Sequence, residues 1–385
     1  MRVTSSATYR NYTNSVNDVH SSLNKSMNKV TTGKAYESAA DNPLAYYEGK
    51  KIDDQYQDIL SKLSLTTDVK NRLYQQELGA RSIQTTLSEA KIKIEYIRSD
   101  SNNGDMGIVG TTRDALLQKQ QSMINDLNGQ YQNFYIFGGS DTNTAPFSLS
   151  DDGMELTFTH KFADDNFATT MKMTLKPQDD GSYKYEFSGT TGNPAQSMDS
   201  DETLDAIMRA MKEQGPVDVG YGTISDRSTL LDTYTGGLNL LTGLSSNAVN
   251  AMNDPAQAKK EIEDRLNKSP IGLIGQAVAA ADNYMNGGSK GDFTSTLGKV
   301  MDTMTETEHS VSTVYSDLGN KYALLEKTED KLNTMKLDLT KQYKDRLGAN
   351  PYEAITEMFS YQQSYNAALK VGSQIMSSSL FDFMR

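Results

Sequence analysis

The chain has 385 residues, with 50 acidic and 38 basic side chains and a formal net charge of −12. Its length suggests two or three domains. The acidic excess argues against a nucleic-acid-binding protein, because such a protein needs a basic surface. There is no cysteine, which excludes disulfides and thiolate chemistry, and three dispersed histidines argue against a histidine-rich metal centre.

The sequence carries no sign of a membrane span or a cleaved leader. No apolar run reaches the roughly 18 residues that a transmembrane helix needs. The opening residues, Met1–Thr8, contain no apolar segment and no small-residue cleavage site. We therefore expect a protein that is cytosolic or that leaves by a route that does not read a cleaved signal peptide.

Proline and glycine divide the sequence into two end regions and a middle. Six of the eight prolines lie between Pro146 and Pro270, and 21 of the 28 glycines lie between residues 101 and 295. Both residue types are unfavourable inside helices. The two ends can therefore form long helices, whereas the middle cannot.

The N-terminal region has the apolar spacing of long helices. Steps of three and four residues connect Tyr9 to Val30, close to a heptad seam, and Gly33 is placed to end that helix. Asp41-Asn42-Pro43 can begin the next helix, with Pro43 in its first turn. The spacing predicts this second helix over residues 56–97 and a third over residues 111–135.

The C-terminal region repeats the pattern. Apolar residues follow helical spacing from Leu297 to Tyr343, and a last helix, rich in Ser, Gln and Asn, follows Pro351. These narrow seams must be buried. The economical arrangement is one antiparallel bundle built from both chain ends, with the middle inserted outward.

The middle alternates apolar and polar residues in three short stretches, 154–159, 170–175 and 183–187, which turn residues separate. This pattern predicts a small antiparallel sheet. Short helices are expected over residues 202–212 and after Asp254-Pro255.

We therefore predict a mainly α protein with an inserted β-rich domain. The predicted segments are an N-terminal assembly helix and loop (1–45), the first part of a helical bundle (46–140), an outward α+β or β-rich insertion (141–290), the second part of the bundle (291–347) and a C-terminal assembly helix (348–385).

No catalytic or cofactor constellation is found. A phosphate-binding loop is absent, because Thr32-Gly33-Lys34 lacks the upstream glycine. His309 lies on a helical pattern beside two glutamates, which is typical of a solvated helix face. We therefore predict that the protein is not an enzyme and that it holds no metal and no cofactor.

Three features are more informative: the interhelix step from Thr32 to Pro43, the aromatic and glycine-rich stretch from Asn133 to Phe147, and the Ser/Gln-rich C-terminal helix with its apolar tip at residues 380–384. Together with Met1-Arg2-Val3-Thr4 they resemble the flagellin superfamily, and within it the hook-associated protein 3 family of the hook–filament junction. The similarity covers about residues 1–147 and 296–385. Its signature residues here are Gly33, Pro43, Asn133, Phe137, Gly138, Gly139, Pro146 and Phe147.

The resemblance implies a non-enzymatic structural protein of the bacterial flagellum, located outside the cell after export through the flagellar type III channel. It implies a ring of copies between hook and filament, with the terminal helices in the inner core. The implied partners are another hook-associated protein, flagellin, further copies of this chain and a cytosolic export chaperone, with neither nucleic acid nor membrane among them.

We expect the terminal helices to carry assembly, either between chains or within one. The predicted interface residues are Tyr12, Val16, Val19, Leu23, Val30, Ile355, Met358, Tyr365, Leu369 and Met376. Their burial is roughly balanced by the cost of ordering an isolated pair of helices, so we expect order to appear only when neighbouring copies add contacts. The alternatives are flagellin itself, which shares these ends, and a helical tethering or signalling module with no link to a flagellum.

Overall fold

The computed structural model describes residues 2–179, 181–213, 216–218, 230–232 and 236–383. Side chains are described within these ranges except at residues 2–6, 216–218, 230–232 and 375–383. The chain forms two compact units. Unit 1 contains Met1–Ser64 and Glu329–Arg385, and unit 2 contains Leu65–Thr328.

Long helices come from both chain ends, as predicted. They are α1 (Arg2–Thr32), α2 (Pro43–Arg98), α9 (Lys290–Leu347) and α10 (Pro351–Phe383). Gly33 ends α1 in a left-handed conformation with φ of 69°, which a residue without Cβ adopts readily. Pro43 is the first residue of α2, and the Asn42 side chain accepts a hydrogen bond from the Ala45 amide at 3.1 Å.

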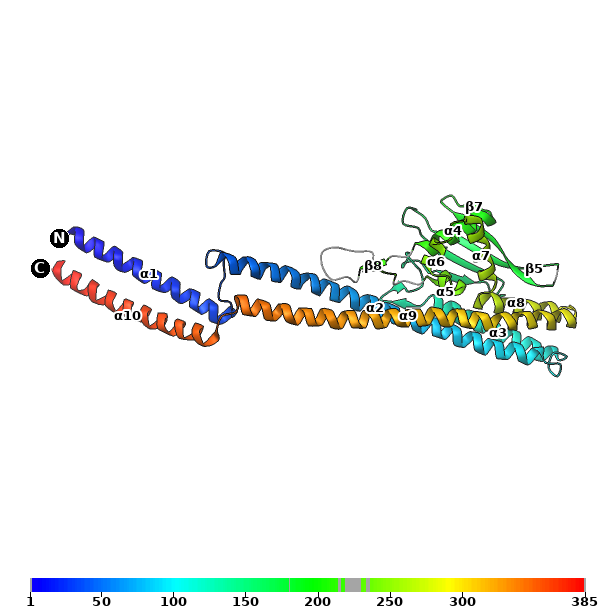
Figure 1. Ribbon diagram of the computed structural model, residues 1–385. Helices are drawn as coiled ribbons and strands as arrows, with labels where there is room; N and C mark the ends of the chain where they lie inside the picture. The colour runs from blue at the N-terminus through cyan, green and yellow to red at the C-terminus, as the bar shows by residue number, and fades with distance from the viewer. Residues whose placement is uncertain (1, 180, 214–215, 219–229, 233–235, 384–385) are drawn as a thin grey trace. The chain divides into compact units, whose positions relative to one another are not determined.

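Within unit 2, α2 and α9 lie side by side and antiparallel (Figure 1). Their side chains meet in opposite chain order: Tyr74 contacts the Tyr322 ring, Ser88 Oγ donates to Glu308 at 2.7 Å, and Lys91 Nζ donates to Thr305 at 2.9 Å. The expected pairing of seams from both sequence blocks is therefore confirmed in this unit.

The inserted region contains a five-stranded antiparallel sheet of order β3-β4-β5-β6-β7. Its strands are β3 (Phe147–Leu149), β4 (Glu155–His160), β5 (Thr169–Pro177), β6 (Tyr183–Thr191) and β7 (Gln196–Met198). Alternate residues are buried along the central strands, with Phe158 opposite Met171 and Met173 opposite Phe187. This confirms the predicted mainly α fold with an inserted antiparallel sheet.

Shorter elements complete unit 2. They are α3 (Met106–Leu127), β1 (Gln130–Tyr131), β2 (Phe134–Tyr135), α4 (Ser200–Lys212), β8 (Pro216–Asp218), β9 (Leu230–Asp232), α5 (Gly237–Thr242), α6 (Ser246–Asn250), α7 (Pro255–Asn267) and α8 (Pro270–Met285). As predicted, Asp254 caps α7 with Pro255 in its first turn. The almost wholly buried α8 is a helix that the sequence analysis did not identify.

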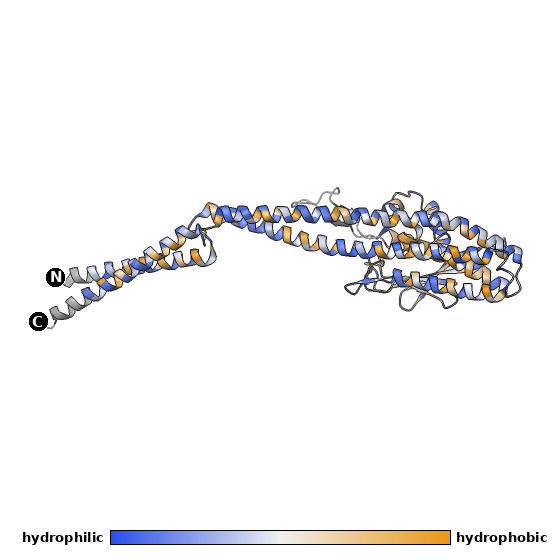
Figure 2. Cartoon of the chain, turned by 90° about the horizontal axis from the view of Figure 1, so that it is seen from below, coloured by the Kyte–Doolittle hydropathy of each residue, from blue (hydrophilic) through white to orange (hydrophobic). Residues whose placement is uncertain are grey.

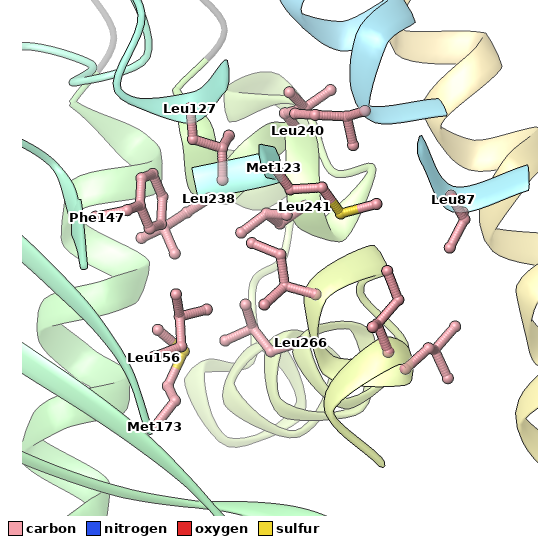
Figure 3. Packing of buried hydrophobic residues seen from close by; sticks show 14 of the residues in the cluster. Leu87, Met123, Leu127, Phe147, Leu156, Met173, Leu238, Leu240, Leu241 and Leu266 are labelled. Atoms are coloured by element: carbon pink, nitrogen blue, oxygen red, sulfur yellow. The ribbon is translucent and has the colours of Figure 1, made fainter. Parts of the chain in front are cut away.

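One hydrophobic cluster joins the helices and the sheet of unit 2. Figure 3 shows Leu87 of α2, Met123 and Leu127 of α3, the strand residues Phe147, Leu156 and Met173, and leucines of α5 and α7 converging on one volume. Burial of one such side chain contributes about 1.5–3 kcal/mol. The sheet is therefore held to the helices by a shared core.

Candidate assembly interface

The first and last helices of the chain, α1 and α10, pack antiparallel within unit 1 (Figure 1). The Tyr12 hydroxyl donates a hydrogen bond to the Ala368 carbonyl at 2.9 Å. The His20 and Tyr365 rings lie 5.3 Å apart, and Lys29 Nζ lies 3.0 Å from Glu357 Oε2. These contacts define a single register for the pair within one chain.

The two helices carry opposite charge. Helix α1 has four basic side chains and one acidic, a net +3, whereas α10 has one basic and three acidic, a net −2. Between the described side chains of the two helices, Lys29 and Glu357 form an ion pair. The resulting attraction is screened by salt, because the Lys29–Glu357 pair is about one-third exposed.

A short backbone bridge closes the base of the pair. The Ala35 amide donates to the Leu347 carbonyl at 2.6 Å, and the Ala349 amide donates to the Gly33 carbonyl at 2.8 Å. Lys34 and Gly348 are thus paired as in an antiparallel sheet. This bridge fixes the end of α1 beside the start of α10.

The predicted interface residues divide into two groups. Those half-buried between the helices are Tyr12, Val16, Val19, Leu23, Met358 and Tyr365. Val30, Ile355 and Leu369 instead remain 37%, 40% and 46% exposed, and the Met376 side chain lies outside the described residues. The first group therefore stabilises the pair itself, and the second is available to other molecules.

Further exposed apolar side chains lie on these helices, among them Tyr9, Met27 and Phe359, at 52%, 48% and 55% exposure. Tyr9 and Met27 belong to the predicted seam but were not assigned to the interface, and Phe359 was missed. Phe359 lies one helical turn after Ile355 and therefore on the same face of α10. This i, i+4 spacing from a predicted interface residue could have identified it. Figure 2 shows such apolar positions interspersed among polar ones along both helices.

A hollow of about 250 Å³ lies where α1, the loop after it and α10 meet. Charged side chains of both signs line it, including Lys25, Lys29, Asp41 and Glu357. Hydrogen bonds from Lys25 and Ser38 hold the pKa of Asp41 below its ordinary value. Lys25 pairs with Asp41 and Lys29 pairs with Glu357, so these charges at the hollow are already neutralised.

The signature residues between Asn133 and Phe147 lie in unit 2, away from α1 and α10 in the chain. The third helix ends at Leu127, not at residue 135 as predicted. The chain then makes the β1–β2 hairpin, in which Gln132 and Asn133 adopt positive φ of 51° and 66°. The expected helix was wrong here because the aromatic spacing continues past a turn that Asn128 and Gly129 begin.

Phe137 is fully buried, and Pro146 and Phe147 are buried too. The Phe137 ring fills the space over Gly79 of α2, and its carbonyl accepts the Gly237 amide at 2.8 Å. Gly138 leaves no room for a Cβ against the Asp141 carbonyl, and Gly139 has a φ of 69°. These residues anchor the strand β3 side of the sheet to the helices, which is a structural role.

No family model matches the chain, and no curated protein matches it. Among solved structures it is similar to a protein from Vibrio parahaemolyticus provisionally assigned as a flagellar hook-associated protein, at 12% identity, with 80% of this chain and 100% of that chain covered and a TM-score of 0.49. It is also similar to Bacillus cereus FlgL, at 12% identity, with 78% and 100% covered and a TM-score of 0.34. The expected likeness to hook-associated proteins is thus found among solved structures.

The described residues contain no group of three or more metal-ligating side chains. No helix within the described ranges is long and apolar enough to cross a bilayer. Ser140 Oγ lies 3.1 Å from His160 Nε2, but His160 Nδ1 has no hydrogen-bond partner, so the orienting acid of a catalytic triad is missing there.

Proposed function

We propose that this protein is a structural junction protein of the bacterial flagellum, joining hook to filament through α1 and α10. Two independent lines support the proposal: the sequence motifs at both ends and the apolar side chains that the α1–α10 pair leaves uncovered. The observation that carries it is that Val30, Ile355, Phe359 and Leu369 remain exposed on an already formed helix pair.

Covering these side chains needs other molecules. Each would contribute about 1.5–3 kcal/mol on full burial, less what is already covered. The occupants we propose are adjacent copies of this chain in a ring, together with a second hook-associated protein and flagellin. Export through the flagellar type III channel, with a cytosolic chaperone covering the C-terminal helix beforehand, belongs to the same proposal.

Truncation after Gly348 tests the role of α10. Unit 2 contains no residue beyond Thr328, so the truncated chain should keep its core and unfold at nearly the same urea concentration. It should nevertheless fail to support filament attachment and swimming. Motile cells with attached filaments would contradict the proposal.

A sharper test replaces Ile355 and Phe359 together by Ser. Leu337→Ser, at a 70% exposed site on α9, is the control for the loss of an exposed apolar side chain. The double variant should fold and be exported but should leave filaments detached, while the control should swim normally. Equal behaviour of the two variants would count against an interface on α10.

Flagellin is the second candidate, because it shares the chemistry of the ends. Labelled imaging of sheared appendages separates the two. A junction protein occupies a single band at the hook end in few copies, whereas a filament subunit decorates the whole appendage. A tethering or signalling module would be found on neither.

A further inference from the structure

His160 is a buried titratable side chain for which the proposed junction role has no use. It is the last residue of β4 and is 1% exposed. Its ring lies between two aromatic rings, stacked 5.8 Å from Phe158 and edge-on 4.8 Å from Phe162. Phe158 in turn packs on Phe147 at 5.0 Å, so the histidine belongs to the aromatic core of the sheet.

The two ring nitrogens differ in their surroundings. Nε2 lies 3.1 Å from Ser140 Oγ, whereas Nδ1 is buried with no hydrogen-bond partner. A neutral imidazole leaves one nitrogen unpaired in this position. The charged form carries two N–H donors and a positive charge, and its burial is more costly even though the Gly138 backbone partly favours it.

Three charged side chains face the ring. Asp141 comes from the segment that holds Ser140, Arg209 comes from α4, and Glu213 is the residue that follows α4. Burial lowers the pKa of His160, and the carboxylates of Asp141 and Glu213 together with a backbone hydrogen bond at Gly138 oppose this only in part. Asp141 cannot turn toward the ring without loss, because its oxygens already accept the amides of Asn143, Thr144 and Lys161 at 2.9–3.2 Å.

The same contacts hold the segment between β2 and β3 against the sheet. Ser140 bonds the histidine ring, Asp141 bonds the Lys161 amide directly after it, and the Thr159 amide donates to the Pro146 carbonyl at 2.9 Å. An imidazolium that moves toward water must leave Ser140 and pull on the Asp141–Lys161 bond. Movement of a charged ring toward water would therefore strain both contacts that hold the segment.

We propose that His160 is an acid-sensitive latch: protonation of its ring releases residues 138–147 from β4 and opens this side of the sheet. A base whose folded pKa is depressed favours the folded form above the unfolded pKa of about 6.5, and this advantage is lost as the pH falls below it. The opening equilibrium constant should then rise by up to about tenfold per pH unit.

The chain has only three histidines, and the other two, His20 and His309, are exposed, which makes the test specific. Histidine ring signals of the full chain are followed by NMR from pH 8 to pH 4. His160 should titrate below the ordinary histidine pKa of about 6.5. A His160 midpoint at or above that value would overturn the proposal on the wild-type protein alone.

Hydrogen exchange followed by mass spectrometry, corrected for the intrinsic pH effect, then locates the opening. Between pH 7.5 and pH 5.5, peptides covering residues 138–162 should exchange up to about tenfold faster in the wild type and in His309→Gln. His160→Gln, which can bond Ser140 but cannot take up a proton, should lose this acid response. An equal acid response in His160→Gln, or none in the wild type, would refute the latch. Neither outcome bears on hook–filament joining, which rests on unit 1.

Discussion

Tyr12 on the first helix occupies the space that Gly372 leaves empty on the last. A Cβ at position 372 would overlap the Tyr12 hydroxyl, and that hydroxyl donates to the Ala368 carbonyl one turn away. The two residues are 360 positions apart in sequence. The fit of the Tyr12 side chain against Gly372 sets the register of the α1–α10 pair.

Gly372→Ala should therefore loosen the pair, although alanine favours helix. We expect an overpacking cost of about 1–3 kcal/mol and faster hydrogen exchange over residues 10–23. Gly298→Ala is the matched control, because no heavy atom lies within 4 Å of the added carbon. In a Tyr12→Ala background, Gly372→Ala should no longer destabilise the pair. If the destabilisation persists in that background, the contact between Tyr12 and Gly372 is not its cause.

Phe137 and Phe134 give a matched pair within the signature stretch. Phe137 is fully buried and Phe134 is 48% exposed. Phe137→Ala should destabilise unit 2 by about 3–5 kcal/mol, because it leaves a cavity over Gly79. Phe134→Ala should cost less than about 1 kcal/mol. Urea unfolding midpoints measure both, and similar values for the two variants would contradict the assigned anchoring role.

Asn128, which follows α3, connects this helix to β3 through two hydrogen bonds with Phe147. Its side chain donates to the Phe147 carbonyl at 2.7 Å and accepts the Phe147 amide at 3.0 Å. Asn128→Ala should lower the free energy of unfolding by about 1–3 kcal/mol, since both backbone groups lose their partner. Asn143→Ala, at an exposed site, serves as control and should leave the urea midpoint nearly unchanged.

Asp141 predicts a second pH effect, at lower pH than that of His160. Burial acts to raise the pKa of Asp141, but hydrogen bonds from Thr144, Lys161 and Asn143 outweigh it and hold the pKa below its ordinary value. A carboxyl with a depressed folded pKa adds stability above about pH 4 that is lost as the pH falls through the folded pKa.

Asp141→Asn should therefore be less stable than the wild type at pH 7, by about 1–3 kcal/mol, and the difference should shrink toward pH 3. Urea unfolding at both pH values measures it, with exposed Asp151→Asn as control. A difference that stays constant with pH would mean that the charge of Asp141 does not contribute.

Local rules predicted much of the fold. One residue's backbone preference or a short sequence period was enough to predict several features. These are the long helices at the proline-poor ends, the helix boundaries at Gly33 and Pro43, the three alternating strands and the Asp254 cap. The end of α3 did not follow, because Tyr131 and Phe134 keep helical spacing with Met123 and Leu127 while belonging to a hairpin. Helix α8 escaped notice because it is buried all round and so has no polar face to reveal its period.

The candidate interface was likewise only partly predictable from the sequence. Periodicity alone identified an apolar stripe on each terminal helix, because a stripe is a property of one helix. Which members of the stripe are covered depends on where α10 crosses α1. Tyr12 and Tyr365 are half-buried while Ile355 and Leu369 are exposed only because the Tyr12–Gly372 contact and the Lys34–Gly348 bridge fix that crossing. The sequence by itself determined which helices exist and which of their residues are apolar, and the tertiary structure decided which of those residues remain for a partner, because burial depends on contacts between residues far apart in the chain.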